Sequence, residues 1–466
     1  MSSPYFDNNE PAGKIRSILR RFVDSQIVRK LGSGVFWTMC GSVAMQGLTF
    51  ISFFFVARFL GKEGFGDFGV ARATITMFAV FSIFGMGEAT TRYIAANIAQ
   101  GKNHAGRTLT FCTLIAVSSA MLFFLLAYFL LPLISGWGLF PTSLLPYVHW
   151  IALILFCTTI ARFQTGVMAS LQEFKCNAIV NTVVGLFSVV GLIAGAYWVG
   201  VAGALAGMAF SLIGGLVFSV WMIEKLKKKH ALKYSFKNLE KEIPMIWKFA
   251  FPSALEASLS VPVLWVCYLM LTCRFNGKEE MAIYYAALQF YHLAMFAQSQ
   301  VYGVLYPMLA SYEEAKDTKR TTKLLALSFF INIFMGVALT VFLILFAPNL
   351  MGFFGEGYVQ GAPVLILLGL AAVCLSISYT PSLWLGCLEK IWLRFTYAMI
   401  WGIVFLTVSW RLINKDFGAL GLGWAYFLSN LIQAIVAVAV FLVVFHHRNS
   451  RPADGTRCRL KSLTVN

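Results

Sequence analysis

The chain has 466 residues, of which 59% are hydrophobic and only 12% are charged, and its formal net charge is +17. Soluble domains carry about one quarter charged residues, so this composition excludes a soluble globular protein. In a soluble protein such positive charge would suggest nucleic-acid binding, whereas here it belongs to the loops of a membrane protein, and no nucleic-acid partner is expected.

Long apolar runs recur along the whole chain. A run of about 20 residues can cross a hydrocarbon layer of about 30 Å as a helix. Twelve such runs predict an all-α integral membrane protein with twelve transmembrane helices. They lie near residues 34–57, 66–87, 108–134, 146–169, 177–197, 202–223, 249–272, 281–305, 324–347, 363–386, 392–410 and 419–445.

Most of the 37 Lys and Arg fall in the loops on one side of the predicted membrane, including "KLKKKHALK" at 225–233. Positively charged loops face the cytoplasm, so both termini are expected there. Residues 14–31 place apolar side chains on one helical face and cations on the rest. This pattern predicts an amphipathic helix on anionic lipids, with a solvated linker as the alternative.

Short motifs recur at a nearly constant spacing. "RFLGKE" at 58–63 returns as "RFNGKE" at 274–279, with five of six residues matching at an offset of 216 from 58 to 274. Repetition at this distance predicts a duplicated six-helix unit. Two further pairs share the spacing: "LQEFK" (171–175) with "LEK" (388–390), and "GVAGA" (200–204) with "GALGL" (418–422).

The duplicated unit predicts an architecture. Because six is an even number, both copies cross the membrane in the same direction, and two parallel six-helix lobes then enclose a central cleft. Rocking of one lobe against the other gives alternating access. The predicted domains are a cytoplasmic amphipathic N-terminal segment (1–32), an N-lobe of helices 1 to 6 (33–224), a basic cytoplasmic linker (225–248), a C-lobe of helices 7 to 12 (249–445) and a basic cytoplasmic tail (446–466).

Three segments point to a family: "ARFLGKEGFGDFGVA" (57–71), "FGMGEATTRYIA" (84–95) and "QEFKCNAI" (172–179). They resemble the polysaccharide transport proteins, which are the O-antigen and exopolysaccharide flippases of the multidrug/oligosaccharidyl-lipid/polysaccharide exporter superfamily. The sequence departs from that pattern at Glu88, where relatives more often carry a small or apolar residue.

The resemblance implies a flippase of the bacterial inner membrane that serves lipopolysaccharide or exopolysaccharide biosynthesis. Its substrate would be an undecaprenyl-pyrophosphate-linked oligosaccharide, moved from the inner to the outer leaflet. Membrane lipids, a polysaccharide polymerase and glycosyltransferases are the implied partners.

Two arginines lie inside predicted spans, where a charge costs at least about 2.5 to 3.5 kcal/mol. Arg72 lies near the outer end of the second span and Arg162 near the inner end of the fourth. A guanidinium binds phosphate oxygens in a bidentate manner, so we predict that both bind the pyrophosphate. Snorkelling to the membrane surface is the alternative for each.

Glu256 is the only acid well inside a C-lobe span, which makes it the candidate site for a coupling ion, H+ or Na+. An ion pair with Arg162 or a structural hydrogen bond are its alternatives. The weaker site candidates, three of them explained by exposure at helix ends, are Asp67, Glu88, Arg92 and His292.

No enzyme or cofactor chemistry is indicated. The chain has no GxxxxGK[ST] loop and no DxD pair, and its nine cysteines lack CxxC spacing, so neither ATP hydrolysis nor a metal site is expected. A cation-coupled exporter of drugs or metabolites from the same superfamily is the nearest alternative. A membrane glycosyltransferase, a polymerase and a non-transporting scaffold are weaker ones.

Overall fold

A computed structural model describes residues 26–83, single positions between 87 and 97, and residues 102–137, 140–230, 232–236, 239–243, 259–314, 317–388 and 390–449. Within these ranges the chain forms helices joined by short turns and contains no strand, which confirms the predicted all-α class. Of the predicted amphipathic segment at 14–31, only residues 26–31 are described, and they begin the first helix.

The first half of the chain is built on two very long helices. Helix α2 (Gln26–Ile83) has 58 residues and α6 (Phe174–His230) has 57, so each is long enough to cross a membrane twice. Each is broken once at a glycine with left-handed φ, Gly61 at 65° and Gly200 at 67°. Between them lie α4 (Lys102–Gly136), η1 (Thr142–Tyr147) and α5 (Val148–Ser170).

The second half consists of shorter helices and follows a linker that contains η2 (Leu239–Glu242). In chain order its elements are α9 (Ser260–Thr272), α10 (Gly277–Glu314), α11 (Thr318–Phe354), η4 (Glu356–Gly361), α12 (Ala362–Cys387), α13 (Ile391–Ile413) and α14 (Gly418–Asn449).

The twelve predicted crossings can be located among these helices. Eight helices of the described ranges are long and apolar enough to span a membrane. Helix α9 is the described part of the expected span 249–272, and α10 is long but less apolar. Because α2 and α6 each supply two crossings, the described helices account for twelve.

The predicted repeat is visible in the geometry. Helices α4 and α11 begin 216 residues apart, at 102 and 318, and each contains one proline, Pro132 and Pro348, at that same spacing. Gly200 and Gly418, from the matched "GVAGA" and "GALGL" motifs, both have left-handed φ, 67° and 53°. Residues of the two halves at this spacing therefore match in backbone conformation as well as in residue type.

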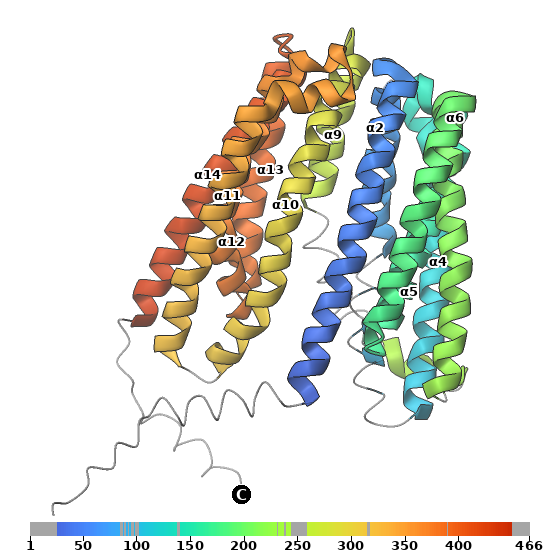
Figure 1. Ribbon diagram of the computed structural model, residues 1–466, viewed down its shortest axis with the longest axis vertical. Coiled ribbons are helices and arrows are strands. Elements are labelled where there is room, and N and C mark those ends of the chain that lie inside the picture. Colours follow the sequence, from blue (N-terminus) through green and yellow to red (C-terminus); the bar gives the residue numbers. More distant parts are fainter. Residues whose placement is uncertain are drawn as a thin grey trace, which may run out of the picture.

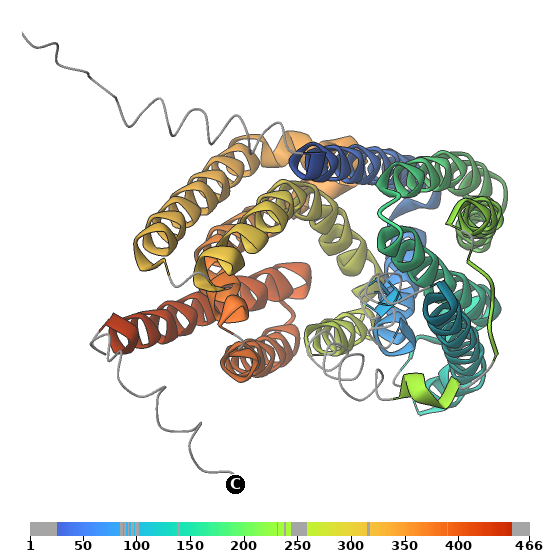
Figure 2. The same cartoon turned by 90° about the horizontal axis from the view of Figure 1, so that it is seen from below.

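The helices gather into two bundles (Figure 1). One contains α2, α4, α5 and α6, and the other contains α9 to α14; seen from below, they lie side by side (Figure 2). The bundles meet at one end and diverge at the other, where α2 begins and α14 ends. Helices α9 and α10 contact α2 and so form the seam between the lobes.

The linker after α6 is fastened to the first bundle. Leu232 is buried there, and the backbone N–H of Ser235 donates to Thr110 Oγ1 at 2.9 Å. The carboxylate of Glu242 pairs with Arg107 at 2.7 Å. These contacts attach residues 232–243 to the start of α4.

Candidate functional site

A cavity of about 350 Å³ lies in the seam between the two lobes. Four helix segments build its walls: both halves of α2 from the first lobe, and α9 and α10 from the second. Its lining combines one cation with amides, aromatic rings and an imidazole: Gln46, Thr49, Phe50, Phe53, Arg72, Ala73, Thr76, Val261, Leu264, Trp265, Tyr268, Tyr285, Leu288, Gln289 and His292.

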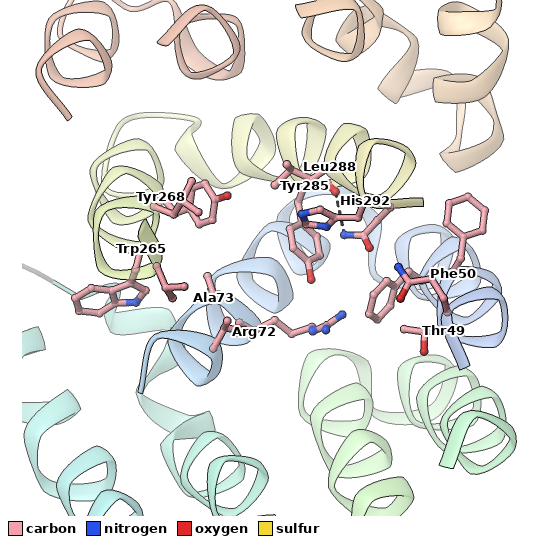
Figure 3. Close-up of a pocket in the computed structure, with 15 residues that line it drawn as sticks. Thr49, Phe50, Arg72, Ala73, Trp265, Tyr268, Tyr285, Leu288 and His292 are labelled. Carbon is pink, nitrogen blue, oxygen red and sulfur yellow. Dashed lines mark hydrogen bonds between the residues drawn. The ribbon is translucent and has the colours of Figure 1, made fainter. Parts of the chain in front are cut away.

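Arg72 is the cation of this cavity. Its side chain extends from α2 into the space below Tyr285 and His292 (Figure 3). The guanidinium carbon lies 4.5 Å from the ring centroid of Phe53, so the charge rests on an aromatic face. No ion pair among the described residues involves Arg72. Its positive charge is thus available to an anion that enters the cavity.

Aromatic side chains of α9 and α10 form the opposite wall. The Trp265 indole N–H donates to Thr74 Oγ1 at 3.0 Å, which ties the ring of one lobe to a helix of the other. Tyr285 stands against Gly69, where a side-chain carbon would come within 2.9 Å of the ring. Gln289 donates to the backbone carbonyl of Tyr285 at 3.2 Å (Figure 3). Planar rings and amides of this kind suit the apolar faces and hydroxyls of sugars.

The cavity sits on the axis that relates the two halves. Residues of α9 and α10 that line it are separated by 216 residues from residues of α2 that line or border it. At these matched positions the first lobe contributes small side chains and the cation, and the second lobe contributes bulky and aromatic groups. The matched positions are Thr49 with Trp265, Gly69 with Tyr285, Arg72 with Leu288, and Thr76 with His292.

Polar contacts close the seam at the end away from the described termini. Lys62 of the first hexapeptide pairs with Glu279 of the second at 3.6 Å. Lys278 pairs with Asp67 at 3.1 Å, and Ser143 also donates to Asp67 at 3.0 Å. The two copies of the repeated motif thus face each other across the lobes.

The backbones approach closely beneath these pairs. Gly66 lies so near the carbonyl of Lys278 that a methyl group at Gly66 would collide with it. One turn further into the helix, Gly69 makes its contact with the Tyr285 ring. Arg58 adds a bond across the lobes by donating to the backbone carbonyl of Phe353 at 3.2 Å. At this end the seam is tightly packed.

The structure distributes the predicted site residues unevenly. Arg72 and His292 both line the cavity. Arg162 is exposed on α5 and is not part of that lining, and Asp67 lies in the packed end of the seam with 8% of its surface exposed. The structure therefore does not bring Arg162 to Arg72. Glu88, Arg92 and Glu256 lie outside the described residues.

Sequence reasoning did not single out the aromatic wall. Trp265, Tyr268 and Tyr285 belong to apolar runs in which one aromatic residue looks like another. The repeat held a usable signal, because adding its offset to Arg72 gives Leu288, at the centre of the opposite wall. Only the fold shows that the two copies meet at this point.

Structures with similar folds are transporters. An inward-facing conformation of a multidrug resistance MATE family transporter of the MOP superfamily matches with a TM-score of 0.77 at 13% identity, covering 90% of this chain and 100% of that one. An outward-facing conformation of such a transporter gives 0.65 at 14% identity, covering 89% and 94%. A MOP superfamily transporter from Pyrococcus furiosus, described as having a binding pocket of reversed polarity, also gives 0.65 at 15% identity, covering 90% and 95%.

These likenesses agree with the predicted twelve-helix, two-lobe fold. In sequence, the EPS I polysaccharide export inner membrane protein EpsE of Ralstonia solanacearum is 22% identical over 391 residues, which cover 82% of this chain and 87% of that protein. The proteins named here are export and transport proteins, in line with the expectation that this chain is not an enzyme. The profile of the family described as "Polysaccharide biosynthesis protein" matches residues 31–313, more than half of the chain, so the chain belongs to this family.

Proposed function

We propose that the chain is a flippase for a lipid-linked oligosaccharide, an undecaprenyl-pyrophosphate-linked repeat unit of O-antigen or exopolysaccharide, in the bacterial inner membrane. The observation that carries this proposal is Arg72, a cation without an ion pair among the described residues, in a cavity between two lobes. A guanidinium held away from bulk water attracts phosphate oxygens more strongly than it would in water. The export function of the EpsE relative supports the same class of substrate.

The two walls of the cavity bind different parts of the substrate. Arg72 takes the pyrophosphate on the first-lobe side. Trp265 and Tyr268 offer planar faces to the first sugar on the second-lobe side, and Gln46 and Gln289 offer amides to its hydroxyls. The polyprenyl chain stays in the bilayer, because its transfer out of lipid would bring no gain in free energy.

Transport follows an alternating-access cycle. Both described ends lie where the lobes diverge, and the positive loops predict that this end is cytoplasmic. The substrate then enters from the cytoplasm and meets Arg162 on the way to Arg72. Separation of the packed end of the seam releases it outward. The lobes that rock are 33–224 and 249–445, with 225–248 as their linker.

The cycle needs an energy source outside this chain. Export of an anion from a cell with a negative interior is favourable, by roughly 2.3 kcal/mol per charge at about 100 mV. Coupling to H+ or Na+, with Glu256 as a candidate site, would help the empty carrier to reset. A polymerase acting on the delivered substrate, which glycosyltransferases have assembled, would maintain the direction.

The test is translocation of a polyprenyl-pyrophosphate oligosaccharide by the purified full chain in liposomes. Arg72→Ala is expected to lower the initial rate at least about tenfold, because one charged hydrogen bond is worth about 1.5 to 3 kcal/mol. Arg72→Lys keeps the charge without the bidentate geometry and is expected to lie in between. Arg162→Ala tests the entry contact separately.

The matched control is Arg320→Ala, which removes an exposed arginine that pairs with Asp317, three residues away. It is expected to transport at the normal rate. Normal translocation by folded Arg72→Ala protein would contradict the proposal. Efflux of cationic drugs that rises in Arg72→Ala would instead favour the drug exporter.

A further inference from the structure

The C-lobe contains a buried polar cluster away from the cavity. Gln298 of α10, Asn332 of α11 and Ser376 of α12 are each at most 2% exposed. The amide nitrogen of Gln298 donates to Ser376 Oγ at 2.6 Å and to the backbone carbonyl of Asn332 at 3.2 Å. Next to them, the hydroxyls of Ser328 and Thr380 lie 2.9 Å apart. Three helices therefore meet at this cluster.

The cluster has more acceptors than donors. The amide oxygens of Gln298 and Asn332 are buried and accept no hydrogen bond from any described group. The Asn332 amide nitrogen donates to the backbone carbonyl of Ser328 at 2.9 Å and to the Ser328 hydroxyl at 3.3 Å. The Ser376 hydroxyl donates to its own helix at 2.6 Å. Once these bonds are made, only one hydroxyl hydrogen of the Ser328 and Thr380 pair is left.

This surplus favours a cation over a water molecule. A buried water would donate to both amide oxygens, but its own lone pairs would find at most one hydrogen. A small cation has no such requirement, because it is held by oxygen lone pairs alone. Buried polar atoms without partners call for an explanation of this kind.

The matching place in the N-lobe is complete without a ligand. Ser82 and Thr159 lie at the positions of Gln298 and Ser376, and their hydroxyls are 2.7 Å apart. Thr159 also donates to its own helix at 3.0 Å, as Ser376 does. Neither N-lobe oxygen is left without a partner. The longer amide of Gln298 thus adds an acceptor that the shared framework does not need.

Two further differences surround Asn332. The N-lobe carries Ala116 at the position of Asn332 and Ala120 at the position of Gly336. A methyl group at Gly336 would collide with the Ser376 hydroxyl, so the C-lobe keeps this side of α11 bare. The additional amides therefore occur together with a closer approach of Ser376 to α11.

We propose that this cluster is a binding site for a monovalent cation, with Na+ the ion of matching chemistry. Its ligands are the amide oxygens of Gln298 and Asn332 and the hydroxyl oxygens of Ser328 and Thr380. Neutral oxygens hold an alkali cation without the carboxylates that a divalent ion would require. In the described residues no group of three acidic, His or Cys side chains could hold another metal.

The site is placed to influence transport. Gln298 follows His292 on α10, so one helix carries both the cluster and part of the cavity wall. A bound cation would fasten α10 to α11 and α12. This role in coupling rests on the proposed function, whereas binding of the cation itself does not.

The experiment is therefore a binding measurement without substrate. The full chain is purified in detergent, and its Tm is compared in NaCl and in choline chloride at equal ionic strength. Binding to the folded state is expected to raise Tm by about 2 °C or more in NaCl. The variant Gln298→Ser/Asn332→Ala, which installs the N-lobe residues, is expected to lose this difference.

Ser82→Ala is the matched control in the N-lobe and is expected to keep the full response to Na+. Asn332→Asp is a second variant for the case in which the double variant fails to fold. Its carboxylate should strengthen the binding of radioactive Na+. Equal Tm of the wild type in the two salts, or an unchanged Na+ response in the folded double variant, overturns the site. If the wild-type chain binds Na+ but does not translocate the lipid-linked oligosaccharide, this result would count against the proposed function alone.

Discussion

Leu288 occupies in the second lobe the position that Arg72 occupies in the first, and both face the same cavity. The lobes share their turns, as the left-handed Gly200 and Gly418 illustrate. They differ in the side chains that line the cavity: the N-lobe supplies the guanidinium, and the C-lobe supplies the aromatic wall of α9 and α10. Duplication thus supplied a symmetric container, and later substitution made its two walls chemically different.

The asymmetry has a physical reason. Two arginines facing each other across about 350 Å³ would repel when the cavity is empty, whereas one cation opposite aromatic rings does not. The proposed substrate has a charged end and a sugar end, which would need two kinds of wall. The difference between the lobes therefore matches a substrate that is itself asymmetric.

The largest effect is expected from moving the charge between the walls. Arg72→Leu should lower translocation at least about tenfold, since charged hydrogen bonds are lost. Adding Leu288→Arg should restore much of the rate, because the guanidinium then enters the same cavity from the other lobe. The readout is the initial rate in liposomes. If the double variant is as slow as Arg72→Leu, the rate depends on which wall carries the guanidinium and not only on the presence of its charge.

The next effect concerns stability of the C-lobe at the end where the lobes diverge. Glu313 accepts from Arg448 at 2.6 and 2.7 Å and from the Trp384 indole at 2.7 Å. Glu313→Ala leaves these donors without a partner and should lower the free energy of unfolding by about 3 kcal/mol. Glu313→Gln keeps the shape and serves as the control. Thermal unfolding in detergent measures both, and equal Tm for Ala and wild type would contradict the expectation.

A smaller effect is expected at the paired glycines. Any side chain in the left-handed conformation costs about 1 to 2 kcal/mol, so Gly200→Ala and Gly418→Ala should both lower Tm. Around Gly200 an added methyl group meets open space, but at Gly418 it would collide with the Glu280 carboxylate, which accepts from the backbone of Ala419 at 2.7 Å. Gly418→Ala should therefore be the worse of the two. The reverse order would show that the two turns are not equivalent.

The smallest effect is expected for the exposed Lys62–Glu279 pair at the rim of the packed end. Lys62 and Glu279 are 3.6 Å apart with 25% and 43% of their side chains exposed, so Lys62→Ala should cost about 0.5 kcal/mol. Lys278→Ala should cost more, about 1 to 2 kcal/mol, because among the described groups the buried carboxylate of Asp67 then keeps only Ser143. Chemical unfolding of the two variants side by side tests the ranking.

Much of the fold follows from patterns that are local in the sequence. Apolar runs locate the helices, and the matched motifs at 200 and 418 predict the turns that the structure contains there. The two copies of the hexapeptide solve their turn differently, with left-handed φ at Gly61 in one and at Asn276 in the other. This one-residue shift falls at the single letter in which the hexapeptides differ, because Asn adopts the left-handed conformation more readily than Leu.

The candidate site was less accessible to sequence reasoning. Arg72 could be selected because a charge in an apolar run is rare, but Arg162 met the same criterion and lies elsewhere. Depth in the membrane gives no information about which way a helix is turned. Gln298 and Asn332 are ordinary amides until their distances show which of their atoms have no partner.

The glycine contacts at Gly66 and Gly69 bear on how the protein can move. Where a backbone touches another backbone, as at Gly66, or a ring, as at Gly69, a separation of less than 1 Å already forfeits much of the dispersion energy, yet the gap is too narrow for water to enter. Half-open states of this joint are therefore poorly populated. In the proposed cycle, the molecule should therefore switch between the closed and open states of this end in one step, so that sugar and ions have no continuous leak path.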